Sequence, residues 1–299
     1  MLLNPILEKD MKTKMRGWRM PVLLSLYLFF MGLVLFLFFA ANDQLAGRYG
    51  VNSFNPRIAV NAYNVIALFQ FGLLMFIVPA LTATSISGER ERQTLDLMLC
   101  SDISTWSVVL GKLVVSAAHV LLLITASLPI LGMVLLFGGI TFGEMLLLLL
   151  FYVITALMIA SLGIFFSTLF RKSVVAVIAT YIFLGILGIG PIITLAIISI
   201  FDRGNLNITD SYGMVVAILF PSPAFGYASF MSGGQGGVFS LFNEIQQLAD
   251  RGQGWLRLFR PWLLNSAFDL ILAAILVSLS AWKLNPVKGR RPKAAKRAE

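Results

Sequence analysis

Four charged residues stand side by side in the stretch SISGERERQTLDLMLCSDIS, residues 85–104: Glu89, Arg90, Glu91 and Arg92. Apolar residues follow at positions i, i+3 and i+4, the spacing of one helical face: Leu95, Met98 and Leu99. A short amphipathic helix that begins with a charge cluster suits docking on another protein, because its apolar face fills a groove and its charges fix the register. A solvated loop whose leucines rest on lipid headgroups is the alternative, so the solvent around this segment matters.

Composition identifies that solvent. Of the 299 residues 58% are hydrophobic, well above the roughly 45–50% of a soluble domain. One aqueous core cannot hide that much apolar surface, so the sequence predicts an all-α polytopic membrane protein whose main solvent is the bilayer. The formal net charge is +9, and the basic residues crowd the chain ends and short loops. This pattern is typical of membrane orientation rather than of nucleic-acid binding.

Several catalytic classes are disfavoured by what the sequence contains. The chain has one cysteine, Cys100, and one histidine, His119, too few for a zinc cluster, an internal disulfide or a histidine-based triad. We expect both side chains to pack, with His119 hydrogen-bonded. The chain also contains no G-x-x-x-x-G-K-[ST] motif, since Gly111-Lys112 is followed by Leu113. ATP chemistry therefore requires a partner.

Six segments are long and apolar enough to cross about 30 Å of hydrocarbon, which takes roughly 20 helical residues. They are residues 20–41, 60–85, 106–137, 143–170, 173–201 and 262–283. A seventh candidate, residues 213–231, is interrupted by Pro221 and Pro223. We interpret it as a broken re-entrant or interfacial piece, because a seventh span would export the basic tail.

Lysine and arginine counts predict the orientation. With six spans and the N-terminus in the cytoplasm, 17 of the 23 basic residues lie inside. The six outside are Arg48, Arg57, Arg203, Arg251, Arg257 and Arg260. This asymmetry predicts a multi-pass protein of the cell membrane with both termini cytoplasmic.

The connecting segments complete a single transmembrane domain over residues 1–299. Within residues 1–19 the apolar residues form a stripe beside the basic ones, which predicts an amphipathic lead on the inner membrane surface. A disordered basic leader is the alternative. Residues 86–105 lie in the cytoplasm, and residues 202–261 form an external loop that lies on the outer surface or is solvated. Residues 284–299 form a basic cytoplasmic tail with no apolar periodicity.

Some residues within the spans are candidates for function. Asp269 lies about two turns into the last span, where an unpaired carboxylate costs on the order of 2.5–3.5 kcal/mol, so it is either paired or part of the substrate path. Gly185, Gly188 and Pro191 permit a gating hinge or a static kink in the fifth span. Glu144 opens the fourth span, where its charge suits a helix cap.

Small residues step along the fourth span by four, three and four positions: Ala156, Ala160, Gly163 and Ser167. Such a stripe lets another helix approach closely. We expect packing within one subunit, with dimerisation as the alternative.

Residues 88–113, GERERQTLDLMLCSDISTWSVVLGKL, resemble the stretch after the second helix of ABC-2 type permeases, the membrane subunits of a class of ABC transporters. Members of that family typically read E-R-E, a polar residue, G-T-L, several leucines, T-P-I-S, and a G-K that opens the third helix. Gln93 stands where glycine is common and Asp102 where proline is common. The opening NPILEKDMKTKMRGWR also resembles the amphipathic lead of bacterial members. The residues that match are Glu89, Arg90, Glu91, Thr94, Leu95, Leu99, Ile103, Ser104, Gly111 and Lys112.

The resemblance implies that residues 86–105 contain a coupling helix that sits against a separate cytoplasmic ATPase subunit. ATP and Mg²⁺ would be bound by that partner, and this chain would hold no cofactor. Two permease copies, identical or different, would work with two ATPases, and the transport path between the copies would be lined partly by the first, second and fifth spans.

The few charges in the predicted spans favour a hydrophobic or amphipathic cargo, such as a peptide, lipid or drug. A channel or carrier that needs no ATP is the runner-up. An intramembrane enzyme is a third hypothesis, which the scarcity of paired polar groups disfavours.

Overall fold

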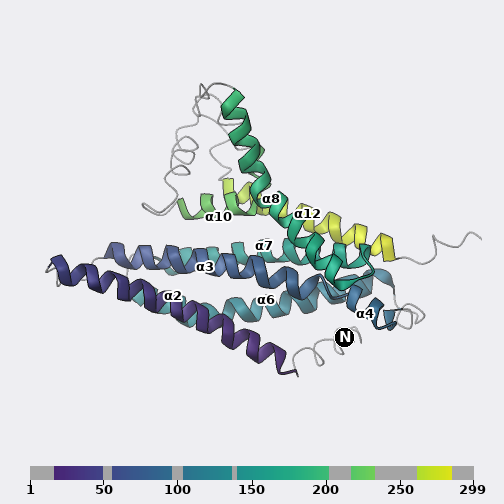
Figure 1. Cartoon of the computed structure of the whole chain (residues 1–299), viewed down its shortest axis with the longest axis horizontal. Coiled ribbons are helices and arrows are strands. Elements are labelled where there is room, and N and C mark those ends of the chain that lie inside the picture. Colours follow the sequence, from purple (N-terminus) through teal and green to yellow (C-terminus); the bar gives the residue numbers. More distant parts are fainter. Residues whose placement is uncertain are drawn as a thin grey trace, which may run out of the picture.

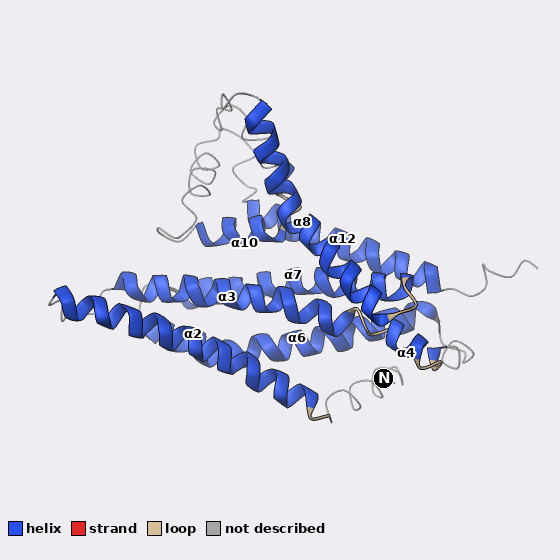
Figure 2. Ribbon diagram, viewed as in Figure 1, coloured by secondary structure: helices blue, strands red, loops and turns tan. Residues whose placement is uncertain are grey.

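The computed structural model describes residues 17–49, 56–95, 104–136, 140–201, 217–232 and 261–284. Over these ranges the chain is helical and contains no strand (Figure 2). The helices are α2 (Arg19–Tyr49), α3 (Pro56–Thr82), α4 (Ser87–Glu91), α6 (Thr105–Leu136), α7 (Phe142–Leu169), α8 (Ser173–Phe201), α10 (Pro223–Ser232) and α12 (Pro261–Leu284).

Six of these helices are long and apolar enough to cross a membrane: α2, α3, α6, α7, α8 and α12. The six predicted spans are therefore confirmed, and most of their ends agree to within a few residues. The span predicted at residues 20–41 agrees with the candidate span Met20–Ala41, and the helix α2 itself continues beyond it to Tyr49. The added turns contain polar residues, so hydropathy alone could not extend the span over them.

Helix α7 is the centre of the bundle. In the most apolar stretch of α7, 67% of the residues are buried, against 11% in the corresponding stretch of α2 and 6% in that of α8. Helices α3, α6 and α12 pack around α7, and α2 covers α3 and α6. In Figure 1 α2, α3, α6 and α7 run along the long axis of the molecule, while α8 rises away from them. The apolar surfaces of α2 and α8 are thus left largely uncovered by this chain.

The small-residue stripe of α7 packs within the chain, as predicted. Ala156, Ala160, Gly163 and Ser167 are all buried. At Gly163 an added Cβ would lie 2.0 Å from Oγ1 of Thr82, so α3 approaches α7 too closely for any side chain there. The glycine therefore sets the distance between these two spans.

The segment with two prolines is broken where the sequence predicts a break. Ser222 lies between Pro221 and Pro223, and its Oγ accepts a 3.4 Å hydrogen bond from the amide of Phe225. Pro223 is the first residue of α10, a position that requires no backbone donor. Helix α10 packs against α12 and α8. The re-entrant or interfacial depth of the segment in the membrane stays a prediction.

Other predictions fall outside the described residues. These are the amphipathic lead up to residue 16, the remainder of the external loop, the basic tail after residue 284, and the part of the coupling segment that contains Met98, Leu99 and Cys100.

Candidate functional site

The candidate site is α4 and the turn that follows it, at the end of the bundle where α3 stops and α6 begins. The first turn of α4 is capped from another helix. The amides of Ile86 and Ser87 donate to Oγ of Ser167 in α7, at 2.9 and 2.8 Å. Oγ of Ser87 donates in turn to the carbonyl of Ala83, at 3.0 Å. Since the residue before α4 is an isoleucine with no capping side chain, the Ser167 hydroxyl supplies the cap instead.

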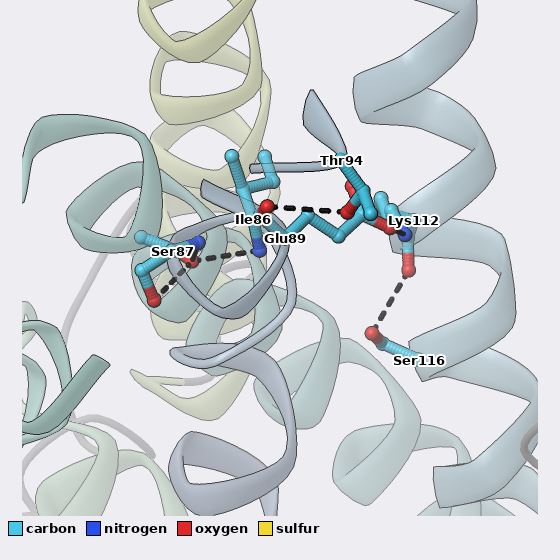
Figure 3. Close-up of polar contacts among 7 residues, drawn as sticks. Ile86, Ser87, Glu89, Thr94, Lys112 and Ser116 are labelled. Carbon is cyan, nitrogen blue, oxygen red and sulfur yellow. Dashed lines mark hydrogen bonds and ion pairs between the residues drawn. The ribbon is translucent and has the colours of Figure 1, made fainter. Parts of the chain in front are cut away.

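An ion pair joins α4 to α6. Nζ of Lys112 donates to Oε1 of Glu89, and Figure 3 shows the two side chains pointing toward each other. The Lys112 side chain is only 2% exposed, whereas that of Glu89 is 25% exposed. A buried ammonium that loses its carboxylate is strongly destabilising, so this contact holds α4 in place. Oγ1 of Thr94 adds a 3.1 Å hydrogen bond to the carbonyl of Glu89 and closes the turn (Figure 3).

Glu91 joins α4 to the start of α8. Its two carboxylate oxygens accept hydrogen bonds from the amide and the hydroxyl of Ser173, at 2.8 and 2.9 Å. A carboxylate at a helix N-terminus is favourable, because the first amides have no partner within the helix. These hydrogen bonds hold the pKa of the exposed Glu91 carboxyl below its usual range, and nearby Lys172 lowers the pKa further.

Glu91 lies beyond the hydrocarbon. The second candidate span runs from Ile58 to Glu91, 34 residues. Within this range α3 alone has 27 residues and at 1.5 Å per residue is about 40 Å long, against about 30 Å of hydrocarbon. Helix α4 follows the turn after α3 and therefore lies beyond the hydrocarbon.

The two arginines at the end of α4, Arg90 within it and Arg92 directly after it, differ in their surroundings. Nη1 of Arg90 donates to the carbonyls of Thr168 and Phe170 at the end of α7, at 3.3 and 3.5 Å. Arg92 is exposed, and no hydrogen bond or ion pair joins its side chain to another described residue. Of the four clustered charges, three therefore have partners within the chain and Arg92 faces outward.

The turn after α4 requires an unusual backbone conformation. Gln93 has φ of 58°, the left-handed region that glycine adopts most easily. It is the one non-glycine residue with positive φ in the described ranges. This is the position at which ABC-2 type permeases commonly have glycine, so the structure gives a physical reason for that preference.

Leu95 points into the protein. It is 3% exposed and belongs to a small apolar cluster with Ile86, Val109, Ile164 and Val277. Leu95 therefore anchors the turn to α6, α7 and α12, and does not present a surface to a partner. Docking of residues 86–105 on a partner stays a prediction, and residues other than Leu95 would supply the apolar contacts with that partner.

Four long helices, α3, α6, α7 and α8, are each attached to α4 by the chain or by the contacts above. A displacement of α4 would act on the ends of all four. In the part of the chain that the structure describes, no group of three or more His, Cys, Asp or Glu side chains could hold a metal ion.

The residues predicted to line a pathway or a gate lie in a second region, where α8, α10 and α12 meet. The carbonyl of Gly188 accepts a 2.9 Å hydrogen bond from Oγ of Ser222. Nδ2 of Asn265 donates to the carbonyl of Ser222 at 3.2 Å, and Asp269 follows Asn265 one turn later in α12. Gly188 and Asp269 are thus connected through two residues that the sequence analysis did not single out.

Gly185 and Pro191 flank Gly188 on α8. Pro191 lies inside a helix that continues to Phe201. No neighbouring atom lies within 4 Å of a Cβ built on Gly185 or Gly188, so close packing does not require either glycine. The gating role of all three residues stays a prediction.

Two predictions about single residues are confirmed. Glu144 completes a capping box with Thr141 at the start of α7, in which each residue's side chain accepts from the other's amide. His119 is 4% exposed, and its Nδ1 lies 2.6 Å from the carbonyl of Val115. Neither residue belongs to the candidate site.

Comparison with protein families extends the resemblance seen at residues 88–113. A family model described as "ABC-2 family transporter protein" matches residues 4–237. The match includes α4, its contact residues on α6, α7 and α8, and α10. A comparison with curated proteins finds no match.

Proposed function

This chain belongs to the ABC-2 family of transporter proteins, and we propose that it is the permease subunit of an ATP-driven exporter. A separate cytoplasmic ATPase subunit binds ATP and Mg²⁺, because the sequence has no phosphate-binding motif of its own. Two permease copies and two ATPases form the working complex in the plasma or inner membrane. The largely exposed spans α2 and α8 are available for contact with the second copy.

The observation that carries the proposal is the attachment of α4 to the ends of the spans. Figure 1 shows the start of α2, α4 and the end of α12 at the same end of the molecule. The excess of lysine and arginine on this side supports a cytoplasmic location. An ATPase that pushed on α4 would move α6 through Glu89 and Lys112, and α8 through Glu91 and Ser173.

Arg92 is the sharpest test of docking, because its charge is not needed inside the chain. Arg92→Glu should lower the amount of ATPase that copurifies with the permease by roughly tenfold, the effect of losing about 1.4 kcal/mol of charge complementarity. The melting temperature of the permease alone should stay unchanged. The measurement is quantitative mass spectrometry of the purified complex, together with its ATP hydrolysis.

Arg171→Glu is the matched control, since Arg171 is also exposed at this end of the molecule but lies in the turn between α7 and α8. Equal binding by wild type and Arg92→Glu would exclude Arg92 from the docking surface. Absence of any copurifying ATPase, with transport by the lone chain in liposomes, would favour the ATP-independent channel or carrier.

The internal ion pair calls for a separate test. Glu89→Lys should lower both stability and ATPase binding, because it leaves Lys112 buried beside a like charge. The exchange of both charges, Glu89→Lys with Lys112→Glu, should restore binding if the pair acts only by holding α4. Restored stability without restored binding would mean that Glu89 contacts the ATPase directly.

The cargo is a hydrophobic or amphipathic molecule, such as a peptide, lipid or drug. A strongly charged solute would find few groups in the spans to replace its hydration shell. In lipid nanodiscs, hydrophobic peptides and lipids should stimulate ATP hydrolysis by the complex, whereas hydrophilic glycans should not. Stimulation by glycans alone would overturn the cargo class and leave the transport function intact.

A further inference from the structure

Asp269 is fully buried between the spans. Its exposed fraction is 0%, and neither carboxylate oxygen has a hydrogen-bond partner among the described residues. It lies eight residues after Pro261, about 12 Å along α12 from the start of that helix. The Thr155 side chain of α7 lies beside the Asp269 carboxyl. It is 2% exposed, and its Oγ1 is likewise without a hydrogen-bond partner of ordinary geometry among the described residues.

No described charge neutralises this carboxyl group. The elements packed against α12 are α6, α7 and α10. Their ionisable groups are used elsewhere: Lys112 pairs with Glu89, His119 bonds within α6, Glu144 caps α7, and the Tyr152 hydroxyl donates to the carbonyl of Ala67. Tyr227 on α10 has a phenol side chain, which carries no charge near neutral pH. Lys283 lies more than three turns further along α12 and is exposed.

An ionised, unpaired carboxylate in such a place is very unfavourable, and buried groups of this kind instead take up a proton. A protonated carboxyl has one O–H donor, and Oγ1 of Thr155 is an unused acceptor across the interface. One proton therefore supplies the missing donor for both residues. No cavity is needed for this ligand, in contrast to a metal ion.

We propose that Asp269 and Thr155 form a proton-binding site inside the transmembrane bundle, and that this site links the packing of α12 on α7 to pH. In the packed state the Asp269 carboxyl holds its proton and donates it to the Thr155 hydroxyl. When α12 moves away from α7 and water enters, the O–H bond breaks and the proton passes to water. This inference does not depend on the proposed transport function.

The sign of the pH effect follows from proton linkage. The packed state binds one proton more than a state in which Asp269 is hydrated and ionised, so raising the pH favours separation. Stability from this site is fully present at low pH and is lost as pH rises through the range in which the packed state releases its proton. Asn265, one turn earlier, would carry the movement to Ser222 and Gly188.

Infrared spectroscopy of the full chain in a detergent without ester groups tests for the proton directly. Exposed aspartate and glutamate side chains are ionised above about pH 5, so a carboxylic-acid C=O band that persists at pH 7 must come from a buried group. We expect one such band in wild type and in Glu144→Gln, which keeps the capping box, and its loss in Asp269→Asn. Thr155→Val should shift the band, while Thr180→Val, at a buried threonine that bonds within its own helix, should not.

Thermal unfolding between pH 5 and pH 9 tests the linkage. Wild type should lose stability with rising pH. For a single proton the ratio of folded to unfolded protein should fall by at most tenfold per pH unit. Asp269→Asn should lack this part of the pH dependence. The proposal is wrong if wild type shows no buried carboxylic-acid band at pH 7, an outcome that needs no variant to fold. It is also wrong if stability at fixed pH follows the sodium concentration, which would identify a metal-cation site.

Discussion

At the scale of single residues, the charges of α4 have different tasks. Glu89, Arg90 and Glu91 bond to α6, α7 and α8, while Arg92 is exposed. Three of the four charges that sequence reasoning interprets as one docking surface therefore form contacts within the chain. The difference matters for mutagenesis, because reversing Glu89 or Glu91 disturbs the fold of the site as well as any contact with a partner.

The left-handed conformation of Gln93 predicts an unusual response to glycine. Gln93→Gly should leave the protein equally stable or up to about 1 kcal/mol more stable, because relief of backbone strain outweighs the entropy of glycine. Gln93→Val should destabilise it by about 1–3 kcal/mol, since a β-branched residue tolerates positive φ poorly. Thermal unfolding of both variants in one detergent gives the comparison, and the opposite order would contradict the backbone assignment.

The contact between Glu91 and Ser173 predicts a response to acid. Because the pKa of Glu91 is lowered in the folded protein, its contribution to stability is present at neutral pH and is lost as pH falls through the lowered pKa. Hydrogen exchange at the Ser173 amide should therefore accelerate in acid relative to unfolded-chain rates. Glu91→Gln should show fast relative exchange at every pH, and an unchanged pH profile in that variant would exclude the contact.

The sequence predicts the roles of residues whose partners are close in the chain, but not of residues whose partners are distant. Glu144 is predictable because a capping box depends on residues three apart in the sequence. The partners of Glu89 and Glu91 are not, because they lie 23 and 82 residues away. The family pattern places Glu89 and Lys112 in one motif, but only the structure shows that they meet. The small size of Ser167 favours close helix packing, but its role as the cap of α4 requires knowing which helix lies beside it.

At the scale of elements, α7 determines the arrangement of the bundle. It is the most buried span, and Gly163 faces α3 while Thr155 faces α12. The contacts with Ser167 and with the carbonyls at the end of α7 also anchor α4. Helix α7 is therefore the element through which the candidate coupling site and the buried Asp269 are physically connected.

Gly163 is the position at which this central packing is most easily broken. Gly163→Ala would place a Cβ 2.0 Å from Oγ1 of Thr82 and 3.0 Å from the backbone amide of Ala83, so the helices must separate. Destabilisation of about 1–3 kcal/mol is expected, the usual cost of overpacking. Thermal unfolding in detergent is the measurement.

Gly72→Ala on α3 is the control, since no atom lies within 4 Å of a Cβ at that position. It should be neutral or slightly stabilising, because alanine favours a helix over glycine. Equal effects of the two substitutions would mean that the contact between α3 and α7 is looser than the structure shows.

Elements were the easiest level to predict. Six apolar runs of about the right length leave little freedom in a membrane, where each backbone group must be bonded within its own helix. The helix α2 continues past the predicted span 20–41 to Tyr49, because helix formation in its polar last turns does not depend on hydropathy. The turn at Ser222 was predictable in place from its two prolines, whereas its bonds to α8 and α12 were not.

At the scale of the whole molecule, the end of the bundle that carries α4 differs from the region where α8, α10 and α12 meet. One end carries α4 and its polar contacts, together with the start of α2 and the end of α12 (Figure 1). The contacts among Ser222, Gly188 and Asn265 lie elsewhere along the spans. A transporter driven from one side of the membrane needs this division, with a firm attachment where force enters and a separable interface where helices move.

The orientation of the molecule is the last prediction, and it decides which side the ATPase can reach. If the basic residues set the topology, single cysteines at Asn207 and Gln246 in a Cys100→Ser background should react with an impermeant maleimide added to intact cells. A cysteine at Ala295 should react only after the cells are permeabilised. Labelling of that position in intact cells would put the end of α12 outside, and α4, which lies at the same end of the bundle, would then be inaccessible to a cytoplasmic ATPase.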